Sequence, residues 1–200
     1  MSVPSDKKTN TGTTGSQEDI KPALRRSLLD IRRSLDDATR ADWDKKISAH
    51  ITHHLHIHAI SSLGVYFSTR NEPDLMELYV ALSEKGMPLS LPVVMGKASP
   101  LQFARWKPGD PMTRDSFGIS TPKAREFVPL PEALLVPCLG FTPERFRLGY
   151  GGGYFDRTLE QTPRPHTIGI AYTCLKADFP VQEYDIPMDC IITETGTIQG

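Results

Sequence analysis

The sequence predicts an α/β fold, in which a mainly parallel central sheet lies between two layers of helices. Short apolar segments rich in strand-forming residues recur along the chain, and a helical segment separates the first two of them. The order strand, helix, strand implies a right-handed parallel crossover. A chain of 200 residues is the size of one compact domain. We therefore expect a single three-layer α/β/α domain with a short strand excursion.

Residues 1–19 differ in composition from the rest of the chain. They are rich in Ser, Thr, Gly and Lys and contain almost no apolar side chains. Ordering such a segment costs backbone entropy that no burial offsets. We expect a flexible tail over residues 1–19 and a folded domain over residues 20–200.

The folded part is predicted to begin with an amphipathic helix, because apolar residues recur at steps of three and four from Lys21 onwards. Its apolar face contains Leu24, Leu28, Ile31 and Leu35. The arginines between them are expected on the other faces; they are Arg25, Arg26, Arg32 and Arg33.

A second helix is predicted after Asp36, because the segment from Asp36 to Thr39 has the residues of a helix end followed by an N-cap. Its inward residues are Trp43, Ile47, Ile51 and Leu55. Five histidines lie near its end: His50, His53, His54, His56 and His58. We interpret them as a solvated face rather than a metal site, because no acid or cysteine there completes a ligand set.

Five segments are predicted to form strands of one sheet: Leu63 to Phe67, Leu89 to Val94, Ala133 to Cys138, Thr167 to Tyr172 and Cys190 to Thr193. A helix from Asp74 to Lys85, ended by Gly86, separates the first two. The segment from Leu101 to Trp106 is expected to be a strand excursion. The stretch from Lys107 to Pro122, rich in Pro and Gly, is expected to be a long loop, and loops of this length are often functional.

Composition excludes several classes of function. Lys and Arg total 23 against 24 for Asp and Glu, so the net charge of −1 gives no broad field to attract nucleic acid or an anionic membrane. Three cysteines without CxxC spacing argue against a disulfide framework or a zinc cage, and we expect them to be buried apolar residues. No apolar run approaches the ~20 residues that span a bilayer. We expect a cytoplasmic protein with no obligate protein partner.

The segment from Arg147 to Asp156 has the composition of a site that binds phosphate. Four of its residues are glycines, which allow backbone N–H groups to approach a ligand closely. It precedes a predicted helix, Tyr154 to Gln161, whose first N–H groups would add partial positive charge. Arg147 can add a guanidinium, and Asp156 could meet a magnesium ion held between phosphate oxygens.

The alternative interpretation is that the glycines form an ordinary mobile loop and that Asp156 is a solvated residue of the helix's first turn. The string is neither a P-loop nor a GxGxxG dinucleotide fingerprint. General motifs therefore leave the choice open.

The whole string RLGYGGGYFDR resembles the signature of the 5-formyltetrahydrofolate cyclo-ligase family. The resemblance extends to Lys21 and Arg25, to the segment from Phe67 to Glu72, to Phe117 with the two residues after it, and to the segment from Asp185 to Asp189. It covers the chain apart from the tail, so residues 20–200 would be the catalytic domain.

This resemblance implies roles for individual residues. ATP would be bound by Lys21, Arg25, Arg147, Leu148, Gly149, Tyr150, Gly151, Gly152, Gly153, Tyr154 and Phe155. Of the neighbouring side chains, Arg147, Tyr154 and Asp156 would be catalytic. Magnesium would be associated with Asp156 and Asp189. The folate would contact Phe67, Glu72 and Phe117.

Some of these residues have an ordinary structural interpretation as well. Lys21 and Arg25 share a helix face, where they could reach two phosphates or simply be solvated. Glu72 could accept hydrogen bonds from a pterin or be a turn carboxylate. Phe103, Trp106 and Phe117 could form a stacking wall for a flat ring or belong to the core.

The implied reaction is the ATP- and Mg²⁺-dependent conversion of 5-formyltetrahydrofolate to 5,10-methenyltetrahydrofolate, with release of ADP and phosphate. It needs no enzyme nucleophile, which agrees with the lack of a convincing Ser-His-Asp or Cys-His set. Two alternatives remain open. One is an ATP-dependent kinase or ligase acting on another small amide or carboxylate. The other is a module that senses a nucleotide or sugar phosphate without turnover.

Overall fold

The structure, a computed structural model, describes residues 20–115, 118–182 and 184–200. The expected flexible tail and the predicted folate contact Phe117 lie outside these ranges.

The two predicted N-terminal helices are confirmed as α1 (Ile20–Ser34) and α2 (Asp37–Ile57). Asp36 is the N-cap of α2, because its Oδ1 accepts a hydrogen bond of 2.9 Å from the Thr39 N–H. The inward face of α1 differs from the expectation. Ile31 is 38% exposed, whereas Arg32, expected on a solvent face, is fully buried. The reason is a polar contact that the apolar pattern cannot reveal, described below.

The central sheet contains eight strands in the order β12-β11-β10-β7-β1-β2-β3-β6. The five central strands are parallel to one another, and the edge strands are antiparallel. The parallel strands are β1 (Leu63–Gly64), β2 (Leu89–Val94), β7 (Ala133–Pro137), β10 (His166–Ile170) and β11 (Cys190–Thr193). The flanking strands, each paired antiparallel, are β3 (Leu101–Trp106) and the edge strand β6 (Phe127–Val128) on one side and the edge strand β12 (Gly196–Gln199) on the other. The prediction of a mainly parallel α/β sheet is confirmed.

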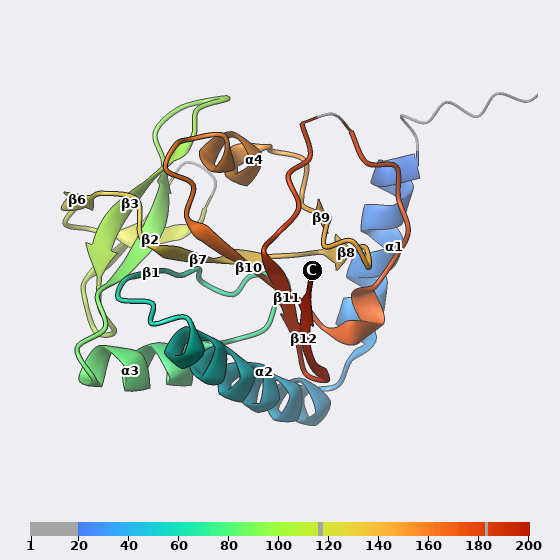
Figure 1. Cartoon of the computed structure of the whole chain (residues 1–200), viewed down its shortest axis with the longest axis horizontal. Helices are drawn as coiled ribbons and strands as arrows, with labels where there is room; N and C mark the ends of the chain where they lie inside the picture. The colour runs from blue at the N-terminus through green and yellow to red at the C-terminus, as the bar shows by residue number, and fades with distance from the viewer. Residues whose placement is uncertain (1–19, 116–117, 183) are drawn as a thin grey trace, which may run out of the picture.

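Helices cover both faces of the sheet (Figure 1). The long α2 and α3 (Met76–Glu84) lie along one face, and the short α4 (Tyr154–Leu159) lies on the other. Alternate residues of β7 point to opposite faces, as the period of two in a strand requires. Leu135 packs in the core beneath α2 and α3, and Leu134 and Val136 pack in the core on the side of α4. The three-layer arrangement therefore rests on two apolar cores.

Two segments depart from the expected strand pattern. The strand predicted from Leu63 to Phe67 ends at Gly64, because the chain turns away from the sheet after Val65 donates its N–H to the Ser90 carbonyl. The expected long loop from Lys107 to Pro122 contains a two-stranded sheet of β4 (Met112–Arg114) and β5 (Ser120–Pro122). A further small sheet pairs β8 (Gly140–Phe141) with β9 (Arg147–Leu148).

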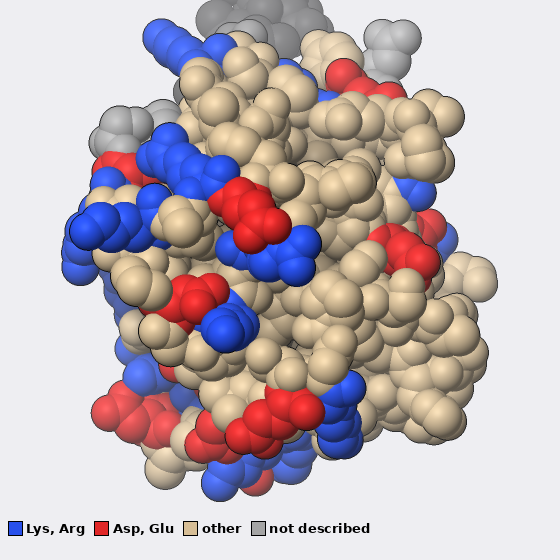
Figure 2. Space-filling model, turned by 90° about the vertical axis from the view of Figure 1, so that its left-hand side faces the viewer, with Lys and Arg blue, Asp and Glu red and all other residues tan. Residues whose placement is uncertain are grey.

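The charged surface is mixed in sign. Figure 2 shows basic and acidic side chains interspersed over the face near the sheet edge formed by β3 and β6. Arg105 and Glu126, for example, form an ion pair of 3.1 Å there. Each helix in the described ranges is too short or too polar to cross a membrane.

The tight packing around Gly64 of β1 leads to a stability prediction. A Cβ added to Gly64 would lie 2.4 Å from Leu134 Cδ2 and 2.8 Å from Phe103 Cε1. We expect Gly64→Ala to lower the free energy of unfolding by about 1–3 kcal/mol, because both neighbours are packed in the core. Urea unfolding followed by circular dichroism measures this change.

Gly96→Ala is the control for this substitution. Its Cβ would meet only the Ser99 hydroxyl, at 3.2 Å, so the free energy of unfolding should change by less than about 0.5 kcal/mol. Equal stability of the Gly64→Ala variant and the wild type would contradict the packing described for β1.

Candidate active site

A cavity of about 820 Å³ lies at the carboxyl ends of the parallel strands. Tyr66 and Phe67, which follow β1, line it together with Val94 at the end of β2 and Pro137 at the end of β7. In open α/β sheets this edge is where ligands commonly bind, because the loops that leave the strands converge there. The volume lies within the range of small-molecule sites.

The first turns of α1 supply cations to this cavity. Lys21 and Arg25 are four residues apart and therefore share a face of the helix. Arg25 Nε donates a 2.8 Å hydrogen bond to the Gly149 carbonyl, and Lys21 Nζ forms a 2.9 Å ion pair with Asp185. Both cations are thus held in place by loops from the C-terminal half of the chain.

The glycine-rich segment forms the loop that joins β9 to α4, and all residues from Arg147 to Arg157 line the cavity. Glycine is needed here for space and for conformation. A Cβ on Gly149 would lie 2.2 Å from Nη1 of Arg147 and would displace that guanidinium. Gly153 has a backbone angle φ of +64°, which residues with a side chain rarely adopt. The loop therefore brings the backbone and Arg147 close together.

The helix that follows this loop is shorter than expected. It spans Tyr154–Leu159 rather than extending to Gln161, and no side chain caps its start. A helix of six residues has little macrodipole, so the proposed contribution of its N-terminus to anion binding is not supported. Positive charge at the cavity comes instead from side chains: Lys21, Arg25, Arg70, Arg147 and Arg157.

Arg147 of β9 and Asp156 of α4 form an ion pair that connects the two ends of the loop. Nη2 of Arg147 lies 2.8 Å from Oδ1 of Asp156. The Arg147 side chain is 7% exposed and that of Asp156 is 33% exposed. Nε of Arg147 is buried and has no hydrogen-bond partner among the described residues. A buried donor without a partner is costly, which is consistent with a ligand that completes its contacts.

A partly buried chain of hydrogen bonds joins α1 to the glycine-rich loop and to the segment after β1. Arg32 and Glu72 are buried at its ends, and Tyr150 between them is 38% exposed. Nη2 of Arg32 donates to the Tyr150 hydroxyl at 2.6 Å, and that hydroxyl donates to Oε1 of Glu72 at 2.6 Å. Nε of Arg32 donates to the Arg70 carbonyl at 2.9 Å. Burial and the neighbouring Glu72 carboxylate raise the pKa of Tyr150, so its hydroxyl keeps the proton that it donates.

Glu72 is only 4% exposed, yet it borders the cavity. Its Oε2 accepts hydrogen bonds from the N–H and the hydroxyl of Thr69, as expected of a turn carboxylate. Together with the hydrogen bond from Tyr150, the Glu72 carboxylate accepts three hydrogen bonds. A carboxylate can accept about four, so one acceptor position remains. Phe67 lies close by and packs edge-on against Trp106, with ring centroids 5.2 Å apart.

Most of the predicted site residues line this one cavity. They are Lys21, Arg25, Phe67, Glu72 and the whole run from Arg147 to Asp156. The predicted magnesium contact Asp189 does not line it. Asp189 precedes β11 and accepts two hydrogen bonds of 2.7 Å from Thr167, near the amino end of β10. The cavity lies at the opposite end of these parallel strands, so the structure does not bring Asp189 and Asp156 together.

The suggested aromatic wall is not formed by Phe103 and Trp106. Each is 3% exposed and belongs to the core, as the alternative interpretation held. Tyr150 contributes an aromatic surface instead, since the Arg70 guanidinium lies 5.0 Å from its ring centroid.

The sequence interpretation missed four residues at or beside the cavity: Arg32, Arg70, Arg157 and Asp185. A signal for Arg32 was present, because Lys21, Arg25, Leu28 and Arg32 follow one another at steps of four, three and four. That spacing places them on one stripe of α1. Arg70, Arg157 and Asp185 lie within the segments that carry the family resemblance, but no role at the site was predicted for them.

A model of the 5-formyltetrahydrofolate cyclo-ligase family matches residues 17–194 of the chain. Among curated proteins, the 5-formyltetrahydrofolate cyclo-ligases of Haemophilus influenzae and Escherichia coli K12 are each 28% identical to it. The alignment with the Haemophilus influenzae protein covers 82% of this chain and 92% of that protein. The alignment with the Escherichia coli protein covers 81% of this chain and 93% of that protein.

Solved structures of two related proteins have the same fold. The 5,10-methenyltetrahydrofolate synthetase of Aquifex aeolicus superposes with a TM-score of 0.78 at 27% identity, over 90% of this chain and 92% of that one. The 5,10-methenyltetrahydrofolate synthetase of Mycoplasma pneumoniae superposes with a TM-score of 0.73 at 26% identity, over 87% of this chain and 98% of that one.

The partly buried chain of hydrogen bonds leads to a stability prediction. We expect Arg32→Leu to lower the free energy of unfolding by about 2–4 kcal/mol, because it removes the hydrogen bonds of Arg32 to Tyr150 and to the Arg70 carbonyl. It also takes a cation away from the buried Glu72 carboxylate. Adding Glu72→Gln should recover part of the loss, since the uncompensated charge is then removed. Denaturant unfolding of the wild type, both single variants and the double variant measures the coupling.

Arg33→Leu is the matched control for Arg32→Leu. The Arg33 side chain is 62% exposed, and within the described ranges its one ion-pair partner is Asp30, so we expect a change below about 0.5 kcal/mol. Equal effects of the Arg32 and Arg33 substitutions would show that the buried contact does not stabilise the fold.

Proposed function

Because the chain belongs to the 5-formyltetrahydrofolate cyclo-ligase family, we propose that it converts 5-formyltetrahydrofolate to 5,10-methenyltetrahydrofolate in the cavity described above. One observation carries the placement of this reaction. The cations of α1, the glycine-rich loop with its Arg147–Asp156 pair, and the Phe67–Glu72 segment all border a single cavity. A phosphate-binding surface and a surface suited to a ring with polar edges therefore face the same space.

The proposed co-substrate is ATP, since ring closure requires loss of the formyl oxygen, a poor leaving group. The formyl oxygen attacks the γ-phosphorus, and the bond from that phosphorus to ADP breaks. N10 then attacks the formyl carbon and loses its proton, and the former formyl oxygen departs within inorganic phosphate. The products are the methenyl cation, ADP and phosphate. Catalysis rests on alignment and on stabilisation of the moving charge.

The triphosphate is proposed to lie along the glycine-rich loop, facing Lys21, Arg25 and Arg147. Two of these cations are paired with carboxylates, Lys21 with Asp185 and Arg147 with Asp156. Phosphate oxygens can take over such contacts, because a guanidinium binds phosphate in the same geometry as carboxylate. The remaining predicted contacts of the nucleotide are Leu148, Gly149, Tyr150, Gly151, Gly152, Gly153, Tyr154 and Phe155, which all line the cavity.

Asp156 is the proposed magnesium ligand. It lines the cavity, it is partly exposed, and its contact with Arg147 uses only one carboxylate oxygen. Carboxylate and phosphate oxygens are the ligands that Mg²⁺ prefers, and the ion would neutralise charge on the phosphates. The position of Asp189 at the other end of the strands supports no such role, so the proposal is confined to Asp156.

The folate is proposed to bind against Phe67 and Glu72. The acceptor position that remains on the Glu72 carboxylate suits an N–H group of the pterin. Tyr154 and Arg147 line the same cavity, and we propose that their side chains contact the reacting groups. Phe117 stays a predicted folate contact. We propose a cytoplasmic location, in keeping with three cysteines that form no disulfide.

The direct test of the function is spectrophotometric. Purified protein mixed with 5-formyltetrahydrofolate and Mg-ATP should produce the absorbance of the methenyl product, with one ADP released for each product formed. ATP hydrolysis with another small amide but none with formyl folate would favour a different kinase or ligase. Nucleotide binding without any turnover would favour a sensing module.

Substitution of the central ion pair should impair turnover and leave the fold intact. We expect Arg147→Ala and Asp156→Ala each to lower kcat by about 100- to 1,000-fold, because each removes a charged group from the site of phosphoryl transfer. For Asp156→Ala, the Mg²⁺ concentration that gives half-maximal rate should also rise. Initial rates over a Mg²⁺ series measure both quantities.

Asp178→Ala is the control, because Asp178 is exposed and does not line the cavity. Its rate and Mg²⁺ dependence should match those of the wild type. If Asp156→Ala retained the wild-type Mg²⁺ dependence, Asp156 would not be the metal ligand.

A substitution at Glu72 should separate folate binding from nucleotide binding. We expect Glu72→Gln to raise the KM for 5-formyltetrahydrofolate by roughly 10- to 150-fold, the equivalent of about 1.5–3 kcal/mol for a hydrogen bond to a charged group. The KM for ATP should change little. Glu77→Gln, at an exposed residue of α3, is the matched control. A larger effect on ATP than on folate would overturn the assignment.

A further inference from the structure

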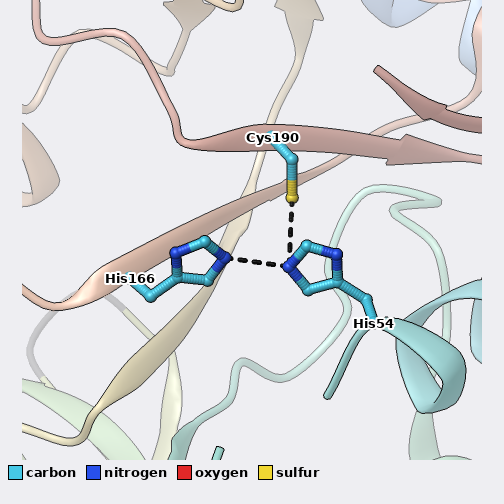
Figure 3. Close-up of side chains that lie close together, drawn as sticks. All are labelled: His54, His166 and Cys190. Atoms are coloured by element: carbon cyan, nitrogen blue, oxygen red, sulfur yellow. Dashed lines mark hydrogen bonds between the residues drawn. The ribbon is translucent and has the colours of Figure 1, made fainter. Parts of the chain in front are cut away.

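A second cluster of reactive side chains lies away from the cavity, between α2 and the sheet. It consists of His54 on α2, His166 at the start of β10 and Cys190 at the start of β11 (Figure 3). Nε2 of His54 lies 2.8 Å from Nε2 of His166 and 3.6 Å from Sγ of Cys190. The ligand atoms of all three residues lie within 4.8 Å of one another.

This arrangement corrects the sequence interpretation in two respects. His54 is 4% exposed and does not belong to a solvated histidine face. The sequence near these histidines contains no acid or cysteine that could complete a ligand set. In the folded chain this ligand is Cys190, which lies 136 positions further along the sequence from His54. Cys190 is buried as expected, but it contacts an imidazole rather than only apolar side chains.

We propose that His54, His166 and Cys190 form a binding site for a thiophilic divalent metal ion of the zinc class. Ions of this class bind imidazole nitrogen and thiolate sulfur, and the cluster offers two imidazoles and one thiolate. Magnesium prefers oxygen ligands instead. Three protein ligands also leave one tetrahedral position for water or another donor. This site is separate from the proposed magnesium contact at Asp156.

The two distances from His54 Nε2 suit a tetrahedral ion after a small adjustment, and the third, between His166 and Cys190, is below 4.8 Å. Bonds of about 2.05 Å to nitrogen and 2.3 Å to sulfur separate a nitrogen and a sulfur ligand by roughly 3.5 Å and two nitrogens by roughly 3.3 Å. The observed nitrogen to sulfur distance is 3.6 Å. The two imidazole nitrogens, at 2.8 Å, need to separate by about half an ångström.

The contacts within the cluster favour a shared cation over hydrogen bonding alone. Nε2 of His54 faces both the His166 nitrogen and the Cys190 sulfur, and a ring nitrogen has a single lone pair or a single proton to offer. It can therefore satisfy only one of the two fully. A cation between the three atoms would use a lone pair from each of them.

One neighbouring carboxylate makes an electrostatic contact with the cluster. Oδ2 of Asp189 lies 3.8 Å from Nδ1 of His166, the ring nitrogen that does not face His54, and this distance is too long for a hydrogen bond. A carboxylate on that side of a histidine makes the other ring nitrogen a better metal ligand. The His166 side chain is 27% exposed, which provides a route from solvent to the cluster.

Cobalt is a suitable probe, because a thiolate bound to Co²⁺ gives a sulfur-to-metal charge-transfer band. We would titrate Co²⁺ into the untagged full chain after treatment with a chelator. One Co²⁺ per chain should bind with that band, one equivalent of Zn²⁺ should remove it, and excess Mg²⁺ should not. Lack of the band in folded wild-type protein would overturn the proposal.

Substitutions assign the band to these residues. Cys190→Ser should abolish it. His166→Gln, at the partly exposed ligand, should weaken Co²⁺ binding by more than about 100-fold, beyond the roughly 10- to 100-fold that loss of a supporting residue costs. Circular dichroism checks that each variant is folded, and if Cys190→Ser does not fold, the result for His166→Gln decides.

Two controls distinguish the cluster from other donors. Cys174→Ser removes the exposed cysteine and His53→Gln removes an exposed histidine of the same helix, so neither should change the band or the affinity. A band that persists in folded Cys190→Ser, or that disappears in Cys174→Ser, would show that the metal binds elsewhere and would contradict the proposal.

Discussion

The contact between Arg32, Tyr150 and Glu72 is the constraint on which the cavity depends. It joins helix α1, the glycine-rich loop and the segment after β1, three parts of the chain that are far apart in sequence. Each also contributes side chains to the main apolar core, Leu28 from α1, Leu148 beside the loop and Tyr66 after β1. Because the Tyr150 hydroxyl bridges a buried guanidinium and a buried carboxylate, moving any of the three elements would leave a buried polar group without its partner.

That fixed frame gives the cavity its electrostatic character. Lys21 and Arg147 already face Asp185 and Asp156 across ion pairs of 2.9 and 2.8 Å. Cations held in this way need little reorganisation when an anion arrives, and such preorganisation is the main source of charge stabilisation in enzymes. The glycine at position 149 contributes by leaving room for the Arg147 guanidinium beside the backbone.

The sheet separates this cavity from the cluster of His54, His166 and Cys190. The cavity lies at the carboxyl ends of β1, β2 and β7, whereas His166 and Cys190 are the first residues of β10 and β11. Parallel strands place their two ends at opposite edges, so the two sites share no ligand. A hard cation beside phosphate and a thiophilic cation at the cluster would therefore have separate sets of donors.

The sequence by itself determined the α/β class, most strands and helices, and the glycine-rich loop with Arg147 and Asp156, because local periodicity, capping and the family resemblance encode them. Tertiary structure decided the burial of Arg32, the separation of Asp189 from Asp156, and the meeting of His54 with Cys190. These depend on contacts between segments more than 30 positions apart, such as the bond from Arg32 to the Arg70 carbonyl. Residue spacing along one element contains no information about such partners, since chain folding alone sets which elements become neighbours.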